Sequence, residues 1–198
     1  MIKRILIAFG VAFGIAFALA MLEVASDTTF GPSAYVMPAA IGSLTFFILQ
    51  MKSGNRKESR LDKAQRQASL SAIAPEGKAL LYVYRDGFVG KAVGWNVSLD
   101  GAVVAQLKSP RFTQIEIAPG PHALRVHVDG FAGTQTTPGE ATFEAKAGDT
   151  VVFAMKAKMG AFKSALSFVR EADASAAVQK LARIPMVAAE SHVGSNAA

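Results

Sequence analysis

The chain has 198 residues, of which 51% are hydrophobic, and its formal net charge is +6. The hydrophobic share exceeds that of an ordinary soluble domain, and most of the excess lies in residues 1–51. The absence of cysteine excludes structural disulfides, thiolate metal sites and a lipidated N-terminal cysteine. We therefore expect any membrane anchor to be built from the apolar segments of the chain.

Two uncharged apolar runs, 5–22 and 35–51, predict a two-helix transmembrane hairpin over residues 1–51. Each run has about 18 residues, and at roughly 1.5 Å per residue such a helix reaches about 27 Å, close to the ~30 Å hydrocarbon core of a bilayer. Both runs are therefore long enough to span a membrane.

A signal peptide is an alternative interpretation of the first run. Lys3 and Arg4 form a positively charged start, and Ala18 and Ala20 resemble a small-residue cleavage site. The apolar run is longer than the ~7 to 15 residues usual for a signal peptide, which favours a retained span.

The charges beside the two runs predict the orientation of the chain. Two basic residues precede the first run, whereas the loop between the runs carries Glu23 and Asp27. Residues 52–66 follow the second run with a net charge of +4. Because positively charged flanks stay in the cytoplasm, we expect a multi-pass protein of the bacterial inner membrane with a cytoplasmic C-terminal domain.

The basic juxtamembrane stretch 52–73 continues the second helix or forms a loose linker. Its charges are explained as the topology signal, and beside anionic lipid each would add roughly 1 kcal/mol of attraction. Nucleic acid is not an expected partner, because the stretch lacks interleaved aromatic residues. The candidate lipid and topology residues are Lys52, Arg56, Lys57, Arg60, Lys63 and Arg66.

Small residues on the two apolar runs are candidates for helix packing. Gly10 and Gly14 are four apart in the first run, and Ala39 and Ser43 have the same spacing in the second. Small residues at this spacing let a second helix approach closely. The packing is expected within the hairpin or between copies of the chain; the alternative is that these residues have no such role.

Residues 74–187 are expected to form an all-β antiparallel sandwich of about eight strands. Short runs of alternating polarity are separated by Gly, Pro and Asp throughout this region. In the first run, Leu81 and Val83 share one face while Tyr82 and Tyr84 share the other. The expected strands are 79–85, 95–99, 102–107, 112–117, 123–128, 141–146, 150–157 and 164–170.

One α-helix is expected to follow the strands, at 171–183. Its apolar stripe contains Ala177 and Leu181, and Pro185 ends it. Residues 188–198 are expected to form a mobile tail.

Turn and strand motifs of the soluble part resemble a known family. The motifs are 81–85 leading to Phe88 and Gly90, then 97–101, 115–126 and 147–149. Together they are similar to bacterial membrane-attached domains of unknown function, related in pattern to PEGA domains and carboxypeptidase-regulatory-like β-sandwiches. The resemblance implies a β-sandwich that is usually not catalytic.

No motif predicts a catalytic residue, a metal site, a cofactor or a small-molecule substrate. His122 and His127 are five apart on one expected strand and so point to opposite faces, and His192 lies in the expected tail. Residues 87–92 differ from a phosphate-binding loop in glycine spacing and in having Ala92 where a hydroxyl is needed.

The expected function is therefore that of a non-catalytic interaction or scaffolding module, for example an accessory subunit of a membrane complex. Its expected partners are membrane lipid and either another protein or further copies through the membrane helices. An envelope-facing ligand-binding domain and a membrane enzyme are the alternatives. The candidate interaction loops contain Phe88, Lys158, Met159, Phe162 and Lys163, whose alternative role is to cap one end of the sandwich.

Overall fold

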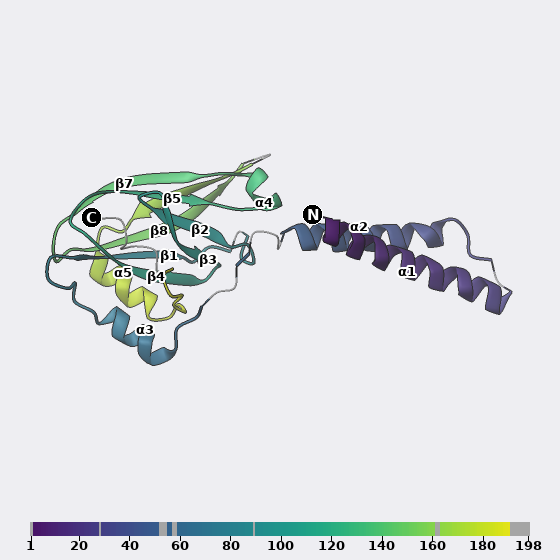
Figure 1. The fold of residues 1–198 in the computed structure, drawn as a ribbon, viewed down its shortest axis with the longest axis horizontal. Coiled ribbons are helices and arrows are strands. Elements are labelled where there is room, and N and C mark those ends of the chain that lie inside the picture. Colours follow the sequence, from purple (N-terminus) through teal and green to yellow (C-terminus); the bar gives the residue numbers. More distant parts are fainter. Residues whose placement is uncertain are drawn as a thin grey trace. The chain divides into compact units, whose positions relative to one another are not determined.

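The computed structural model describes residues 2–27, 29–51, 55–56, 59–88, 90–160 and 163–190. The chain divides into two compact units, Met1–Ser53 and Gly54–Ala198. The first unit is a helical hairpin and the second is the β-domain (Figure 1).

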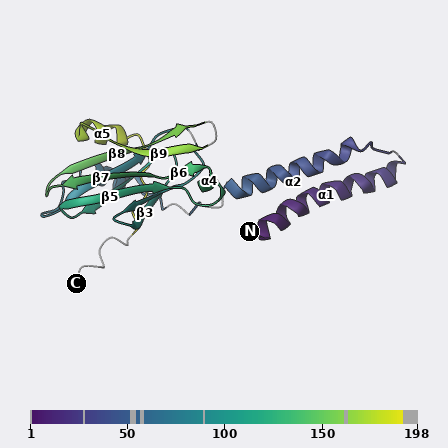
Figure 2. The same cartoon turned by 90° about the horizontal axis from the view of Figure 1, so that it is seen from above.

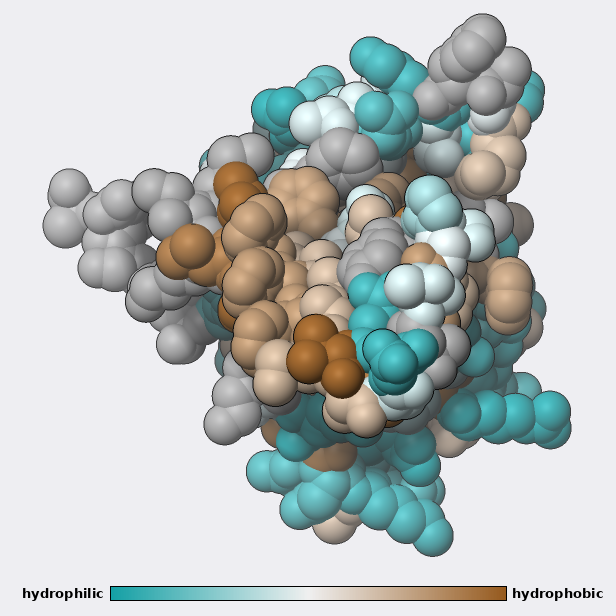
Figure 3. Space-filling model, turned by 90° about the vertical axis from the view of Figure 1, so that its right-hand side faces the viewer, coloured by the Kyte–Doolittle hydropathy of each residue, from teal (hydrophilic) through white to brown (hydrophobic). Residues whose placement is uncertain are grey.

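The first unit contains α1 (Ile2–Ser26) and α2 (Ser33–Met51), which pack side by side (Figure 2). Their outward side chains are mostly apolar (Figure 3). Among the described residues, one helical segment, Ile5–Ser26, is long and apolar enough to cross a membrane. The second apolar helical segment, Val36–Leu49, is shorter than a usual span, so the second span stays a prediction.

The second unit is a sandwich of two sheets with nine strands among its described residues. The five-stranded sheet has the order β4-β1-β8-β9-β6, and the four-stranded sheet has the order β3-β2-β5-β7. The strands are β1 (Ala79–Arg85), β2 (Trp95–Leu99), β3 (Ala102–Leu107), β4 (Arg111–Ile117), β5 (Gly120–His127), β6 (Thr136–Thr137), β7 (Gly139–Ala145), β8 (Thr150–Met159) and β9 (Ser164–Arg170).

The sandwich prediction is confirmed, but the expectation of purely antiparallel sheets is wrong for one sheet. The four-stranded sheet is antiparallel, whereas β1 pairs in parallel with β8 and β6 pairs in parallel with β9. The parallel pairs join strands that are distant in the sequence. Sequence patterns identify hairpins between neighbouring strands but give no signal for such pairings.

Strand β1 lies inside its sheet and is buried on both faces. Leu81 and Val83 belong to the core between the sheets, while Tyr82 and Tyr84 belong to a second apolar cluster on the outer face. The predicted alternation is confirmed. The Tyr84 hydroxyl donates to the Glu171 carboxylate. Burial is the largest cause of the raised pKa of Tyr84, and this hydrogen bond and the charge of Glu171 raise it further.

Helix α5 (Ala174–Leu181) covers that outer face (Figure 2). Asp173 caps its N-terminus by accepting a hydrogen bond from the Ala176 N–H at 3.0 Å, which is the first cause of a lowered pKa of Asp173. The helix is shorter than the predicted 171–183 because the cap fixes its start. Its Leu181 side chain is fully buried against the sheet, in the same cluster as Tyr82 and Tyr84.

Helix α3 (Lys63–Leu70) is separate from α2. The Asp62 side chain accepts from the Gln65 N–H at 2.7 Å, and the Gln65 side chain accepts from the Asp62 N–H at 3.1 Å. This reciprocal cap starts a new helix, so the juxtamembrane stretch is neither a plain continuation of α2 nor a loose linker throughout. The remaining helix, α4 (Phe131–Thr134), is a single short turn.

Candidate functional site

Two segments far apart in the sequence, 59–61 and 186–188, pair as extended chains. The Leu61 N–H donates to the Met186 carbonyl at 3.1 Å, and the Ala188 N–H donates to the Ser59 carbonyl at 2.9 Å. An antiparallel bridge joins Arg60 to Val187 between these bonds. The juxtamembrane segment is therefore attached to the C-terminal segment.

The C-terminal segment 185–190, hereafter the strap, also covers the edges of both sheets. The Val187 N–H donates to the Phe112 carbonyl of edge strand β4 at 2.8 Å. The Glu190 N–H donates to the Val104 carbonyl of edge strand β3 at 2.7 Å. Covering an edge strand blocks its unpaired backbone groups from adding a foreign strand. Residues 188–190 are thus part of the fold, while 191–198 lie outside the described residues.

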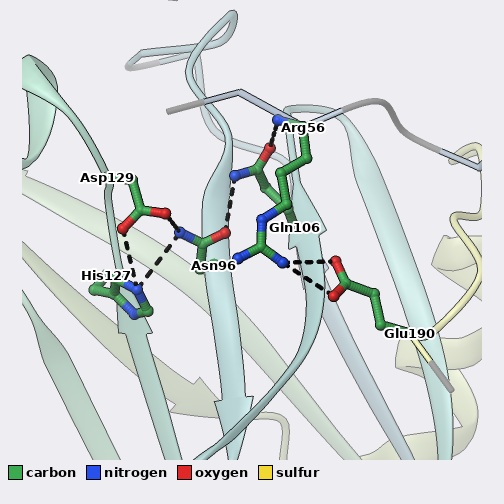
Figure 4. Close-up of polar contacts among 6 residues, drawn as sticks. All are labelled: Arg56, Asn96, Gln106, His127, Asp129 and Glu190. Carbon is green, nitrogen blue, oxygen red and sulfur yellow. Dashed lines mark hydrogen bonds and ion pairs between the residues drawn. The ribbon is translucent and has the colours of Figure 1, made fainter. Parts of the chain in front are cut away.

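A chain of side-chain amides fixes the start of the β-domain (Figure 4). The Arg56 backbone N–H donates to Gln106 Oε1 at 2.6 Å, Gln106 Nε2 donates to Asn96 Oδ1 at 2.8 Å, and Asn96 Nδ2 donates to Asp129 Oδ2 at 2.8 Å. Asn96 and Gln106 are buried. Each buried amide uses both its donor and its acceptor, which offsets the cost of removing it from water.

Asn55 holds the chain on the loop that precedes β2. Its Nδ2 donates to the Ala92 carbonyl at 2.9 Å, and its Oδ1 accepts from the Gly94 N–H at 2.7 Å. A Cβ on Gly94 would lie 2.5 Å from Gln106 Cδ, so any larger residue there would displace the Gln106 side chain. Arg56 and Glu190 form an ion pair at 3.0 Å, but both side chains are partly exposed and the pair adds little stability.

His127 extends the amide chain toward a groove on the outer face of the four-stranded sheet. Its Nε2 lies 3.4 Å from Asp129 Oδ1 and 3.5 Å from Asn96 Nδ2 (Figure 4). Its Nδ1 is buried and no described residue hydrogen-bonds to it. The groove has a volume of about 650 Å³, and Ser98, Arg125 and Thr142 are among its lining residues.

Arg85 is fully buried and fixes the loop between β1 and β2. Its guanidinium donates to the carbonyls of Val93 at 2.6 Å and Gly90 at 2.7 Å, and it lies 3.6 Å from the ring centroid of Trp95. Burial lowers the pKa of Arg85 to about 10, which leaves it protonated at neutral pH. A buried cation held by carbonyls and an aromatic face defines the position of this loop.

Of the predicted helix-packing residues, only those of α2 lie beside the contact between the two helices of the hairpin. A Cβ on Gly42 would lie 2.7 Å from Ala12 Cβ and 3.1 Å from the Ala8 carbonyl oxygen, so the hairpin closes at these three small residues. Ala39 and Ser43 line a groove beside this contact. A Cβ on Gly10 or Gly14 would meet no other described residue within 4 Å, so these glycines do not form the contact between α1 and α2.

The predicted lipid and topology residues are spread over the start of the β-domain. Arg56 is paired as described above, and Arg66 Nη1 donates to the Ile184 carbonyl at 3.5 Å. Arg60 lies in the bridge to the strap, and Lys63 begins α3. Lys52 and Lys57 lie outside the described residues.

The predicted interaction loops lie at one end of the sandwich. Phe88 is 87% exposed and Met159 is 64% exposed, and Lys158 and Lys163 are also exposed. Phe162 lies outside the described residues. No sequence motif points to Arg85, Asn96 or Gln106. Their only signal is a polar side chain within or at the end of a strand otherwise rich in apolar residues.

The described residues contain no group of three or more His, Asp or Glu side chains that could hold a metal ion. In comparisons with known proteins, the sequence matches no family model and no curated protein. The resemblance to PEGA-like sandwiches stays a prediction.

Proposed function

We propose that the chain is a non-catalytic integral membrane protein that presents its β-sandwich as an interaction or scaffolding module, for example as an accessory subunit of a membrane complex. In this proposal α1 and α2 both span the bacterial inner membrane, and the sandwich lies in the cytoplasm. The apolar segment Ile5–Ser26 supports a membrane anchor.

One observation carries the proposal: described residues soon after the hairpin, 55–56 and 59–61, are built into the sandwich. Residues 59–61 pair with the strap, and Asn55 and Arg56 bind the loop before β2 and the buried amide chain. A long flexible linker would let a domain reach many positions around the anchor, as suits a mobile catalytic or substrate-delivery domain. Because the bound residues begin four positions after α2, the linker is short and keeps the domain near the membrane, which favours a partner in the same membrane.

The groove on the four-stranded sheet is the surface that suits such a partner best. Its lining combines apolar Val103 and Ala123 with Arg125, His127 and Glu140. Charged groups around an apolar centre give a protein interface its specificity. The same groove supports the alternative of an envelope-facing ligand-binding domain, since its volume lies within the range of small-molecule sites.

Co-purification of the full chain from native membranes tests the proposal. Ala123→Arg places a long charged side chain in the groove, and Glu116→Arg places one at an exposed position of β4 as a matched control. We expect a stoichiometric protein partner that Ala123→Arg releases and Glu116→Arg retains. If the partner co-purifies with both variants, the groove is rejected as the interface. If no stoichiometric partner is found at all, the scaffolding role is rejected.

A further inference from the structure

The two ends of the sandwich carry opposite charge. One end, hereafter the lysine-rich end, consists of the described residues that follow the paired residues Arg85 and Met155 at that edge of the sheets: 86–88, 90–94, 108–110, 128–138, 156–160 and 163. Its charged residues are Lys91, Lys108, Lys156, Lys158 and Lys163 against Asp86 and Asp129, a net charge of +3.

The opposite end is acidic. It consists of the segments 71–78, 100–101, 118–119, 146–149 and 171–173, which precede or follow the same strands. Its charged residues are Glu76, Asp100, Asp149, Glu171 and Asp173 against Lys78 and Lys146, a net charge of −3. The lysine-rich end is thus distinguished from the rest of the domain, and a basic composition of the whole chain does not explain it.

Exposed apolar side chains project from the lysine-rich end. Phe88 is 87% exposed on the loop after β1, and Met159 is 64% exposed at the end of β8. Lys156 and Lys158 are exposed beside Met159, whereas the intervening Ala157 packs against the core. Exposed apolar side chains at an end that also carries exposed lysines suit an interface where acyl chains meet anionic headgroups.

The chain also enters the sandwich at the lysine-rich end. Asn55 binds Ala92 and Gly94 of the loop that carries Phe88. In the sequence, Asn55 follows Met51, the last residue of α2, by four positions. A membrane-inserted hairpin would therefore keep this end within reach of lipid by a short tether.

We propose that the lysine-rich end docks on anionic lipid, with Phe88 and Met159 inserted at the headgroup level. The inference rests on the proposed membrane anchor and deepens it, because it assigns a lipid class to a surface of the β-domain. Charge complementarity selects an anionic bilayer over a neutral one, and the apolar tips select a lipid surface over a purely polar anion.

Spin labels on the full chain in nanodiscs test the docking, and the absence of native cysteine makes each label unique. Met159→Cys places the label at the lysine-rich end, and Glu76→Cys places a control label at the acidic end. Discs of phosphatidylcholine alone are compared with discs that contain phosphatidylglycerol. We expect the Met159→Cys label to become protected from a water-soluble relaxation agent only in the anionic discs, and the Glu76→Cys label to stay accessible in both.

A charge variant tests the mechanism. Lys158→Gln with Lys163→Gln should lower the ratio of docked to undocked domain about fivefold per lysine, because each basic residue near an anionic surface contributes roughly 1 kcal/mol. Lys78→Gln with Lys146→Gln at the acidic end is the matched control and should leave the ratio unchanged. High salt should weaken the docking.

The possible failures are distinguishable. If the chain is incorporated into lipid but the Met159→Cys label stays accessible in anionic discs, the docking is rejected while the proposed membrane anchor is retained. If the label is protected equally in both disc types, or the lysine changes have no effect, anionic lipid is rejected as the occupant. If the chain is not incorporated into lipid at all, the proposed function as an integral membrane protein is rejected.

Discussion

The guanidinium of Arg85 lies over the ring of Trp95, 3.6 Å from its centroid, inside the sandwich. This contact joins β1 of one sheet to β2 of the other at the lysine-rich end. It also explains how an exposed loop with Phe88 at its tip is held in place: the same guanidinium donates to carbonyls at Gly90 and Val93, on the later part of that loop.

Replacing Arg85 with Met should destabilise the full chain in detergent by about 3 kcal/mol, because buried carbonyls lose a charged donor and the stacking contact is lost. Chemical denaturation followed by Trp95 fluorescence measures this loss. Arg125→Met is the control, since Arg125 is 57% exposed and pairs with Glu140 at 3.7 Å. Equal effects of the two changes would contradict the assigned role of Arg85.

Gly94→Ala should destabilise the β-domain by about 1–3 kcal/mol, because its Cβ would overlap the Gln106 side chain and disturb the amide chain. Gly87→Ala is a matched control, since a Cβ there meets nothing within 4 Å among the described residues. The free energy of unfolding of both variants should be measured together. A Gly94→Ala variant as stable as Gly87→Ala would show that the amide chain tolerates displacement.

His122 should make stability depend on pH. Its Nδ1 lies 2.7 Å from Asp100 Oδ2 and its Nε2 lies 2.8 Å from the Ala118 carbonyl oxygen. Burial lowers the pKa of His122, but the hydrogen bonds to Ala118 and Asp100 and the charge of Asp100 outweigh burial and raise it above its usual value. Both partners are acceptors, so the protonated ring satisfies both.

A raised pKa means that the folded state binds the proton more tightly than the unfolded state. The stabilisation is therefore complete below about pH 6.5 and is lost as the pH rises through the folded-state pKa. Unfolding free energies of the native chain and of His122→Gln should differ more at pH 5.5 than at pH 8.5. A difference that is constant, or larger at pH 8.5, would contradict the assignment.

Gly42→Leu should separate the two helices of the hairpin, because its side chain would overlap Ala12 and the Ala8 backbone. Gly14→Leu should leave the hairpin unchanged, since Gly14 faces open space among the described residues. Distances between spin labels at Leu6→Cys and Phe47→Cys, both on exposed positions, measure the separation. An increased distance in the Gly14→Leu variant alone would place the contact at the predicted glycine pair.

The sequence predicted most strands because their signals are local. Asp100 and Gly101, which form the turn between β2 and β3 with positive φ angles, are adjacent in the sequence. The alternation of Leu81 and Val83 with Tyr82 and Tyr84 likewise depends on neighbouring residues. The two-residue strand β6 is too short to show alternation and was missed.

The site was harder to predict because its contacts join distant residues. Asn96 and Gln106 meet through the register of β2 and β3, and Arg56 reaches Gln106 across 50 positions. Residues 188–190 of the strap were predicted to begin a mobile tail. Small and polar residues give no sign of the sheet edge that they cover. Gly10 and Gly14 were plausible packing residues by spacing, but spacing does not show which helix face meets the partner.

Measuring the side of the inner membrane on which the sandwich lies tests the central claim most directly. In spheroplasts that express single-cysteine variants of this cysteine-free chain, a membrane-impermeant maleimide is applied before and after lysis. Thr29→Cys reports the loop between α1 and α2, and Glu116→Cys reports the sandwich. The two-span anchor with a cytoplasmic module predicts that Thr29→Cys is labelled in intact spheroplasts and Glu116→Cys only after lysis. Labelling of Glu116→Cys before lysis would contradict it.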